Sequence, residues 1–471
     1  MGELQKKERA ELRKRMFAIA IPIAISGLVT QAQMLIDAAF LGHYEVKLAD
    51  GSVLGGGEFL SAVGNVFFPY IVSLAFIWSI TTGTVVLVSQ RLGAKDPEAA
   101  KRYAEASIKF NSILSIGIYL IWAAMAPVIF KILGVREPIL GLSIQYIRTM
   151  SLELFYLGAG TTMGAIFQGL GKTRPEMWTG ILRSVLNIVL DWVMIFGHLG
   201  CPELGVAGAG LATSLSGLIS TVAFVFIAFR ARDLPFRPSV RSIMKAPFKP
   251  YRDVLKVGLP SSVEDSMWNF GNLMLAAFLN ALSAEAVGIY RLVIQIELTP
   301  VFFYFGIARA VTTLVGNKTG ERDIEGAKRI GKRATMDVLF FCLFFTAAFL
   351  AFPKAIIGIF TDRKDLVAIS APFLMIASLT MIPKCINIIS GNGIRGYGDT
   401  MWMLVTQIFG LAFVIGVSWT LIFPLGLGMY GLFITLFLDE TIRGIINTIR
   451  FYRGERSIFH KGLVGEQVKA A

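Results

Sequence analysis

The sequence contains little charge, little cysteine and little histidine. Only 16% of its 471 residues are charged, whereas soluble domains carry about 25% charged residues. A soluble chain of this length would need enough polar surface to cover several packed cores. Because that surface is missing and 55% of the residues are hydrophobic, we expect lipid to surround the protein.

The same shortages exclude several kinds of site. The cysteines are far apart in the sequence and indicate neither a disulfide framework nor a zinc site; they are Cys201, Cys342 and Cys385. The histidines are equally scattered and show no triad or metal spacing; they are His43, His198 and His460. No zinc, serine or aspartyl-dyad motif is present, so we expect no enzymatic activity.

The net charge is +13, but it does not indicate a nucleic-acid-binding protein. The basic residues lie in short loops between apolar runs, where they orient membrane helices. Residues 1–15 form a charged amphipathic lead-in, and the apolar run that follows is too long for a signal peptide. We therefore expect membrane lipid and small organic molecules as partners, no nucleic acid, and a monomer.

Apolar stretches of 20 to 30 residues recur along the chain, and each can cross about 30 Å of hydrocarbon. They predict an all-α polytopic membrane protein with twelve transmembrane helices in two six-helix lobes. The stretches are 16–41, 59–89, 105–133, 139–168, 175–198, 204–230, 254–282, 286–315, 333–360, 366–394, 401–424 and 427–450. The predicted units are 1–15 (N-terminus), 16–231 (first lobe), 232–253 (linker), 254–453 (second lobe) and 454–471 (tail).

Lysine and arginine gather at the N-terminus and in the even-numbered connections. They lie in residues 1–15, 91–102, 172–174, 230–256 and 318–333, and the odd-numbered connections are poorer in them. The positive-inside rule therefore predicts that both termini face the cytoplasm, in the inner membrane.

Two loop motifs repeat at one offset. GAKDPEAAKR at 93–102 matches GERDIEGAKR at 320–329, and QGLGKT at 168–173 matches RGYGDT at 395–400, each 227 positions on. The halves enter the membrane in the same direction, which predicts a pseudo-two-fold axis along the membrane normal. Asp96 and Asp323, in these repeats, are expected to cap helices. Pro22 and Pro260 have a larger offset, so we expect an insertion at 43–57 of the first half.

Together these motifs resemble the MATE (multidrug and toxic compound extrusion) family of antiporters. The opening IPIAISGLVTQAQMLIDAAFLGH has the family's early Pro and late Asp, and NIVLDWVMIFG with LGVAGAGLAT resembles its fifth and sixth helices. The loop repeats resemble the loops after the second and fourth helices of each lobe. Asp37, Asn187 and Asp191 make the sequence most similar to the prokaryotic DinF-type branch.

Asp37 and Asp191 lie deep in apolar runs without a basic neighbour in sequence. Ionisable groups at membrane depth are costly and are functional candidates by default. Asn187 lies one turn before Asp191 on the same helical face, and Thr213 could add a hydroxyl. The resemblance implies that this oxygen-rich cluster binds the coupling ion, H⁺ or Na⁺. The alternatives are a hydrogen-bonded network without an ion and, for Thr213, a bond to its own helix.

Pro22 precedes Asp37 by 15 residues in the same predicted helix. Proline removes a backbone hydrogen bond and kinks a helix. We expect the first helix to bend at Pro22 when Asp37 changes state, as proposed within the family; the alternative is a fixed kink that serves packing.

The second half has its own ionisable residues within apolar runs. Glu264 and Asp265 follow Pro260, Arg291 lies in the eighth helix, and Lys384 lies in the tenth. Glu264 precedes the position at which some family branches carry an essential acid. We therefore favour a structural ion pair of Glu264 with Arg291 or Lys384 over a second cation site.

The resemblance implies export of organic, mostly cationic or polyaromatic compounds, driven by H⁺ or Na⁺ with no other cofactor. A lipid-linked saccharide or lipid flippase of the same superfamily is the alternative. We expect an aromatic, weakly charged cavity between the lobes, with ordinary helix packing as the alternative for each candidate. The candidates are Gln33, Phe67, Tyr70, Tyr146, Phe155, Met163, Trp268, Phe303 and Tyr304.

Overall fold

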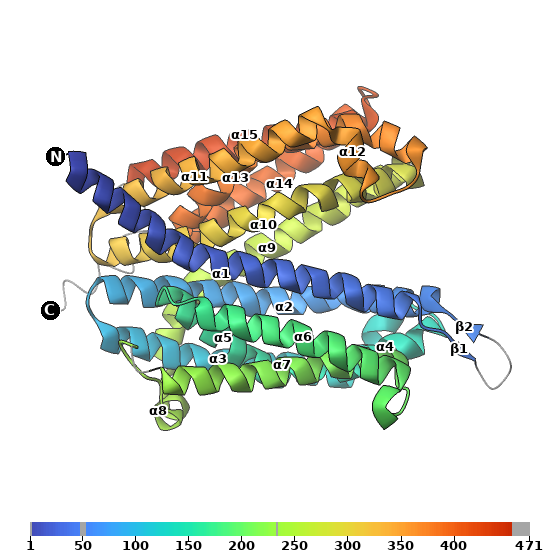
Figure 1. The fold of residues 1–471 in the computed structure, drawn as a ribbon, viewed down its shortest axis with the longest axis horizontal. Coiled ribbons are helices and arrows are strands. Elements are labelled where there is room, and N and C mark those ends of the chain that lie inside the picture. The colour runs from blue at the N-terminus through green and yellow to red at the C-terminus, as the bar shows by residue number, and fades with distance from the viewer. Residues whose placement is uncertain (1, 48–52, 232–233, 455–471) are drawn as a thin grey trace.

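The computed structural model describes residues 2–47, 53–231 and 234–454. His460 and residues 455–471 of the predicted tail lie outside the described residues, as do 48–52 of the predicted insertion. The described chain is almost entirely helical and forms two helical lobes, one above the other in Figure 1. The predicted twelve-helix, two-lobe fold is confirmed.

The first lobe runs from α1 to α7, and its fourth span consists of α4 and α5 joined by the short turn η1. Its elements are α1 (Gly2–Gly42), β1 (Val46–Lys47), β2 (Val53–Leu54), α2 (Gly56–Gly93), α3 (Pro97–Ile132), α4 (Ile139–Met150), η1 (Ser151–Glu153), α5 (Leu154–Gly169), α6 (Arg174–Phe196), η2 (His198–Gly200) and α7 (Gly205–Arg230). The two strands pair antiparallel, with Val46 opposite Leu54. This hairpin occupies the predicted insertion, since only Ser283 separates the corresponding helices of the second half.

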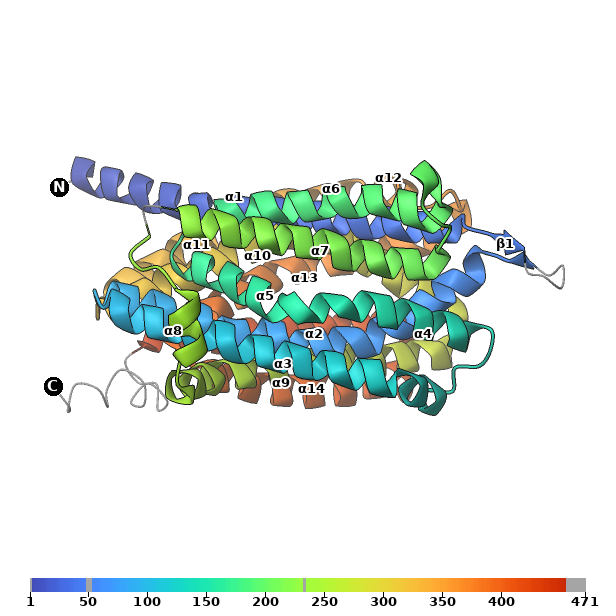
Figure 2. The ribbon, with the colours of Figure 1, turned by 90° about the horizontal axis from the view of Figure 1, so that it is seen from below.

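The second lobe runs from α9 to α15, after a linker that contains the short helix α8. Its elements, with α8, are α8 (Val240–Lys245), α9 (Phe248–Leu282), α10 (Ala284–Gly320), α11 (Ile324–Ala351), α12 (Pro353–Gly358), α13 (Lys364–Tyr397), α14 (Thr400–Ile422) and α15 (Gly428–Arg453). Helix α8 lies against α3 of the first lobe (Figure 2).

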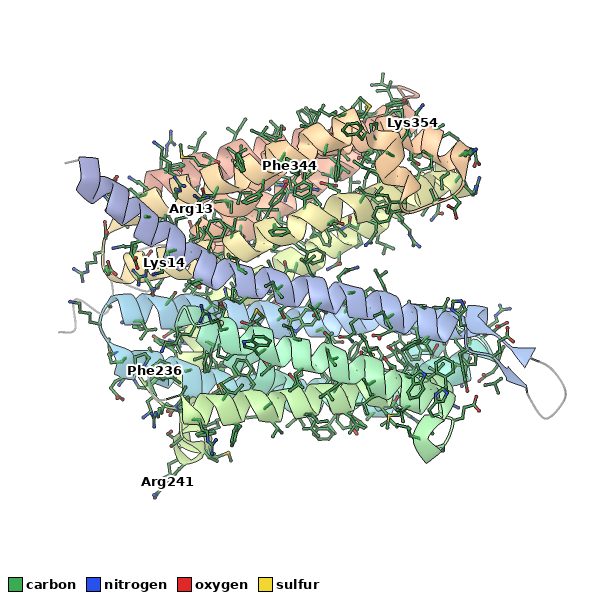
Figure 3. The ribbon with its side chains drawn as sticks, viewed as in Figure 1. Arg13, Lys14, Phe236, Arg241, Phe344 and Lys354 are labelled. Carbon is green, nitrogen blue, oxygen red and sulfur yellow. The ribbon has the colours of Figure 1, made fainter. Side chains whose placement is uncertain are left out.

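Nine helices of the described chain are long and apolar enough to cross a membrane. The other three spans depart from that pattern for visible reasons. One is divided by η1, and α9 and α15 carry acidic side chains within the lobe, among them Glu264 and Asp439. The outward surface is apolar, as expected for lipid contact. Phe344 of α11, labelled in Figure 3, is 66% exposed.

The repeated loop motifs start helices, as predicted. Asp96 is the N-cap of α3 and accepts a hydrogen bond from the Ala99 N–H at 2.9 Å. Asp323 is the N-cap of α11 and accepts one from the Gly326 N–H at 2.7 Å. A side-chain oxygen at this position pairs with a backbone N–H that the helix itself leaves free. These helices therefore begin earlier than the apolar stretches by about two turns.

The two lobes touch along the C-terminal halves of α2 and α10. At Gly83, an added Cβ atom would lie 2.3 Å from the carbonyl oxygen of Val254; at Gly306, it would lie 2.7 Å from that of Ala20. Only glycine allows two backbones to come this close. The N-terminal part of α1 and helix α8 lie at this end of the molecule, and the lobes diverge toward the end that carries β1 and β2 (Figure 1).

Candidate functional site

The first lobe contains a cluster of polar side chains between α1 and α6. Gln33 and Asp37 lie one turn apart on α1, and Gln33 Nε2 donates to Asp37 Oδ2 at 3.2 Å. The same amide donates to Oδ1 of Asn187 on α6. One turn further along α6, the carboxyl group of Asp191 is within hydrogen-bonding reach of Asp37. Asn187 and Asp191 are 0% and 1% exposed, so lipid and water do not reach them on the α6 side.

Three atoms of this cluster are buried without a hydrogen-bond partner among the described residues. They are Oδ1 of Asp37, Oδ1 of Asp191 and Nδ2 of Asn187. Buried polar atoms normally have partners, so the hydrogen-bonded network alone leaves the cluster incomplete. Two adjacent carboxyl groups can share a proton, or their oxygens can coordinate a hard cation such as Na⁺. The residues present fit either ion.

A cation at this place would depend on few ligands. The described residues contain no group of three or more His, Cys, Asp or Glu side chains that could hold a metal ion. Sodium would therefore need the two carboxylates together with neighbouring amide oxygens of Gln33 or Asn187.

Tyr146 and Thr213 were also predicted as site residues, and the structure gives them different surroundings. Tyr146 of α4, predicted to line the substrate cavity, is 9% exposed and close enough to Asp37 and Asp191 to interact electrostatically with both. Thr213, predicted as an ion ligand, donates its hydroxyl to the Ala209 carbonyl of its own helix at 3.1 Å. Thr213 thus makes the hydrogen bond to its own helix that was the alternative to ion binding.

Helix α1 continues through Pro22 without interruption. It changes direction between the sloping part that carries Arg13 and Lys14 and the part that packs between the lobes (Figure 3). Thr173 of the first repeated motif donates to the carbonyl oxygen of Ile19 at 3.0 Å, close to the proline.

A cavity of about 600 Å³ lies between the lobes, lined by α1, α2, α5, α6 and α7 of the first and α9, α10 and α13 of the second. Its wall contains ten serine and threonine side chains and only four aromatic ones. The charged residues of the wall are Arg183, Arg309, Arg395, Glu176 and Asp265. The predicted aromatic, weakly charged lining is therefore wrong.

None of the nine residues predicted to line the cavity is part of this wall. Met163 is 8% exposed and packs in the first-lobe core, whereas Trp268 is 56% exposed on α9. Gln33 belongs to the α1–α6 cluster instead, and Tyr146 of α4 lies near it. Aromatic side chains are common on every face of membrane helices, so residue type alone could not identify the few that face the cavity.

The cavity lies on the pseudo-symmetry axis, because equivalent positions of both repeats line it. Thr82 and Arg309 are 227 positions apart and both line the wall, and so do Gln168 and Arg395. In each pair the second half substitutes an arginine for a neutral side chain. This difference between Gln168 and Arg395 lies within the repeated motifs, and it is the sequence signal that could have indicated a charged cavity.

The ion pairs of the second lobe differ from the predicted ones. Glu264 pairs with Arg395, whose Nη2 donates to Oε1 at 2.7 Å, rather than with Arg291 or Lys384. Lys384 pairs with Glu297 at 2.5 Å, and Arg291 is exposed on α10. Asp265 accepts a hydrogen bond from Ser79 of the first lobe. Glu264 therefore forms an ion pair, but with Arg395 of α13 and with neither of the two predicted partners.

A model of the family described as MatE matches residues 22–193 and 260–420. The "Probable multidrug resistance protein NorM" of Thermotoga maritima is 26% identical over 458 residues, covering 96% of this chain and 95% of that protein. The "Uncharacterized transporter YisQ" of Bacillus subtilis is 26% identical, covering 96% of both. Among solved structures, a MATE family transporter in an outward-facing conformation has a TM-score of 0.85 at 23% identity, covering 95% of this chain and 97% of that chain.

Proposed function

Because this chain belongs to the MatE family, we propose that it is a secondary active exporter of organic compounds, driven by the inward flow of H⁺ or Na⁺. The Thermotoga maritima relative carries the name probable multidrug resistance protein, which supports several unrelated substrates. The proposed location is the inner membrane, where the chain would act as a monomer.

The observation that carries this proposal is the set of unpaired buried atoms of Asp37, Asn187 and Asp191. The cluster is confined to the first lobe. The positions 227 residues after Asn187 and Asp191 hold Val414 and Ser418, which cannot bind a proton or a cation in the same way. Coupling is therefore proposed to reside in the first lobe alone.

The proposed mechanism starts from Asp37, which belongs to α1 but faces α6. A proton or Na⁺ at Asp37 and Asp191 would remove their mutual repulsion and change the acceptors available to Gln33. Because Gln33 connects Asp37 to Asn187, its rearrangement would pull on α1. Pro22 lacks one helical hydrogen bond, so α1 is easiest to bend there. Bending would narrow the space that holds the substrate and release it outward.

Alternating access would come from the two lobes rocking about their contact. The lobes touch at the end that carries the basic N-terminal part of α1 and helix α8. If both termini face the cytoplasm, as the positive-inside rule predicts, the described arrangement is closed to the cytoplasm. It would then be the state that releases substrate to the outside.

Efflux from proteoliposomes tests the proposal directly. The purified chain is reconstituted, several dyes are loaded, and efflux is followed with an imposed pH gradient, an imposed Na⁺ gradient, or neither. We expect dye efflux that depends on one of the two gradients. Efflux that is equal under all three conditions would contradict the proposal.

A flippase of lipids or lipid-linked saccharides is the second candidate, and the three arginines of the cavity wall favour it, since lipid headgroups with phosphate bind arginine well. The same vesicles distinguish the two functions. Movement of a labelled phospholipid between leaflets, without gradient-driven dye efflux, would favour the flippase.

A further inference from the structure

Arg309 has an unusual position in the cavity wall. It belongs to α10, its side chain is exposed, and it lines the cavity. Within the described part of the chain no carboxylate forms an ion pair with it; Glu176, across the lobe contact, interacts with it only at longer range. A guanidinium has five N–H donors in a planar fork. Arg309 therefore presents to the cavity a guanidinium that has no carboxylate at ion-pair distance.

The other two arginines of the wall each form an ion pair with a buried carboxylate that does not line the cavity. Arg183 donates to Glu153 at 2.6 Å, and Arg395 donates to Glu264 at 2.7 Å. Both carboxylates are buried, with side chains 3% and 9% exposed, and neither lines the cavity. Each of these arginines thus lines the cavity while a buried carboxylate outside the wall holds its guanidinium.

The wall also contains two acids, and neither forms an ion pair with Arg309. Oε2 of Glu176 is buried and has no hydrogen-bond partner. Asp265 of the second lobe accepts a hydrogen bond from the hydroxyl of Ser79, which belongs to the first lobe. Six of the ten hydroxyl groups of the wall already donate to backbone carbonyl oxygens. The other four keep their donor hydrogen for a ligand; they are Ser26, Thr82, Thr221 and Ser261. Arg309 is therefore the cation of the wall without an ion-pair partner among the described residues, and four free hydroxyl donors lie in the same wall.

We propose that this cavity binds organic compounds through an anionic group, a carboxylate or a phosphate, and that Arg309 is the residue that binds it. The planar fork of a guanidinium matches two oxygens of either group. The inference rests on the proposed export function and names the substrate class, in addition to the cationic and polyaromatic compounds expected from the sequence.

A matched pair of dyes tests the inference. The ligands are a rhodamine with a free carboxylate and the methyl ester of the same rhodamine, and binding to the full-length chain in lipid nanodiscs is measured by fluorescence anisotropy. The two dyes differ only in the anionic group. We expect Arg309→Gln to weaken binding of the acid about tenfold, as for the loss of a charge-assisted contact, and binding of the ester less than about twofold. Arg309→Lys should bind the acid with intermediate affinity, because lysine keeps the charge but not the fork.

Arg291→Gln is the matched control, since Arg291 is exposed on the same helix, about five turns away, and does not line the cavity. It should leave the affinity for both dyes unchanged. The melting temperature of each variant shows whether the chain is folded. An unchanged affinity of Arg309→Gln for the acid, or an equal loss for acid and ester, would overturn the inference.

Competition identifies the source of the anionic group. Displacement of the acid dye by benzoate but not by short-chain phosphatidic acid indicates a carboxylate substrate, and the reverse indicates a lipid phosphate. If no compound with an anionic group binds, while the ester is still exported under an ion gradient, the inference fails and the proposed function stands. If Arg309-dependent binding is present but neither dye moves under any gradient, the export function fails instead.

Discussion

Gly93 and Gly320 occupy equivalent positions in the two repeats, and each lies against the backbone of the opposite lobe. A Cβ atom at Gly93 would be 1.9 Å from the carbonyl oxygen of Asn317, and one at Gly320 would be 1.9 Å from that of Gln90. Gln90 and Asn317 are themselves 227 positions apart. The ends of α2 and α10 therefore cross symmetrically, and the contact between lobes depends on the absence of two side chains.

The first prediction concerns this crossing. Gly320→Ala should separate the lobes at this end, because backbone atoms cannot move aside as a flexible side chain can, and should destabilise the described arrangement by about 1–3 kcal/mol. Spin labels at the equivalent exposed positions Glu98 and Glu325 should report a longer distance. Gly288→Ala is the control, because nothing lies within 4 Å of a Cβ atom there. An unchanged distance in Gly320→Ala would show that the crossing tolerates a methyl group.

The second prediction concerns the ion cluster. Asp37→Asn keeps the shape of the side chain but removes the carboxylate that Asp191 faces. We expect gradient-driven efflux from proteoliposomes to fall at least about tenfold, while the amount of inserted protein is unchanged. Asp253→Asn is the control, since Asp253 lies near the start of α9 beside Lys256, away from the cluster. Normal driven efflux by Asp37→Asn would exclude Asp37 from coupling.

The third prediction separates structure from coupling in the second lobe. Glu264→Gln leaves Arg395 without its carboxylate, and losing the partner of a largely buried charge should cost about 1–3 kcal/mol of stability. The choice of coupling ion should not change, because the first-lobe cluster is untouched. Thermal unfolding and gradient-dependent efflux measure the two effects. Glu285→Gln, at an exposed site, should change neither. Loss of gradient dependence at unchanged stability would place coupling at Glu264.

The fourth prediction concerns the cap of α11, outside the membrane spans. Partial burial opposes ionisation of Asp323, but the Gly326 N–H and the Lys318 ammonium outweigh it and hold its pKa below the ordinary 3.8. Because the folded-state pKa is lowered, the carboxylate stabilises the protein above pH 3.8 and loses this effect as pH falls through the folded value.

Asp323→Ala should therefore cost about 1 kcal/mol near neutral pH, and the difference from the unmodified protein should shrink in acid. Denaturation across a pH series in detergent measures it. Asp362→Ala, at an exposed loop position, is the control. A difference that persists unchanged below the folded-state pKa would show that Asp323 acts by packing rather than by its charge.

The sequence predicted the features that depend on local pattern. Apolar runs gave the number of spans, and the offset of 227 related the two halves. Asp96 and Asp323 were predicted to cap helices because a cap is fixed by the residues directly beside it. Asp37, Asn187 and Asp191 were predicted as one cluster because ionisable groups deep in apolar runs are functional candidates and because the sequence resembles the MATE family.

Only the tertiary structure decided which residues meet across helices. Glu264 pairs with Arg395 and not with Lys384, and the cavity wall contains Arg309 rather than Trp268. The reason is physical: a membrane helix has the same apolar composition on its lipid face and on much of its packed face. Its rotation and tilt are therefore set by contacts such as Gly93 against Asn317, and those contacts determine which side chains reach the space between the lobes.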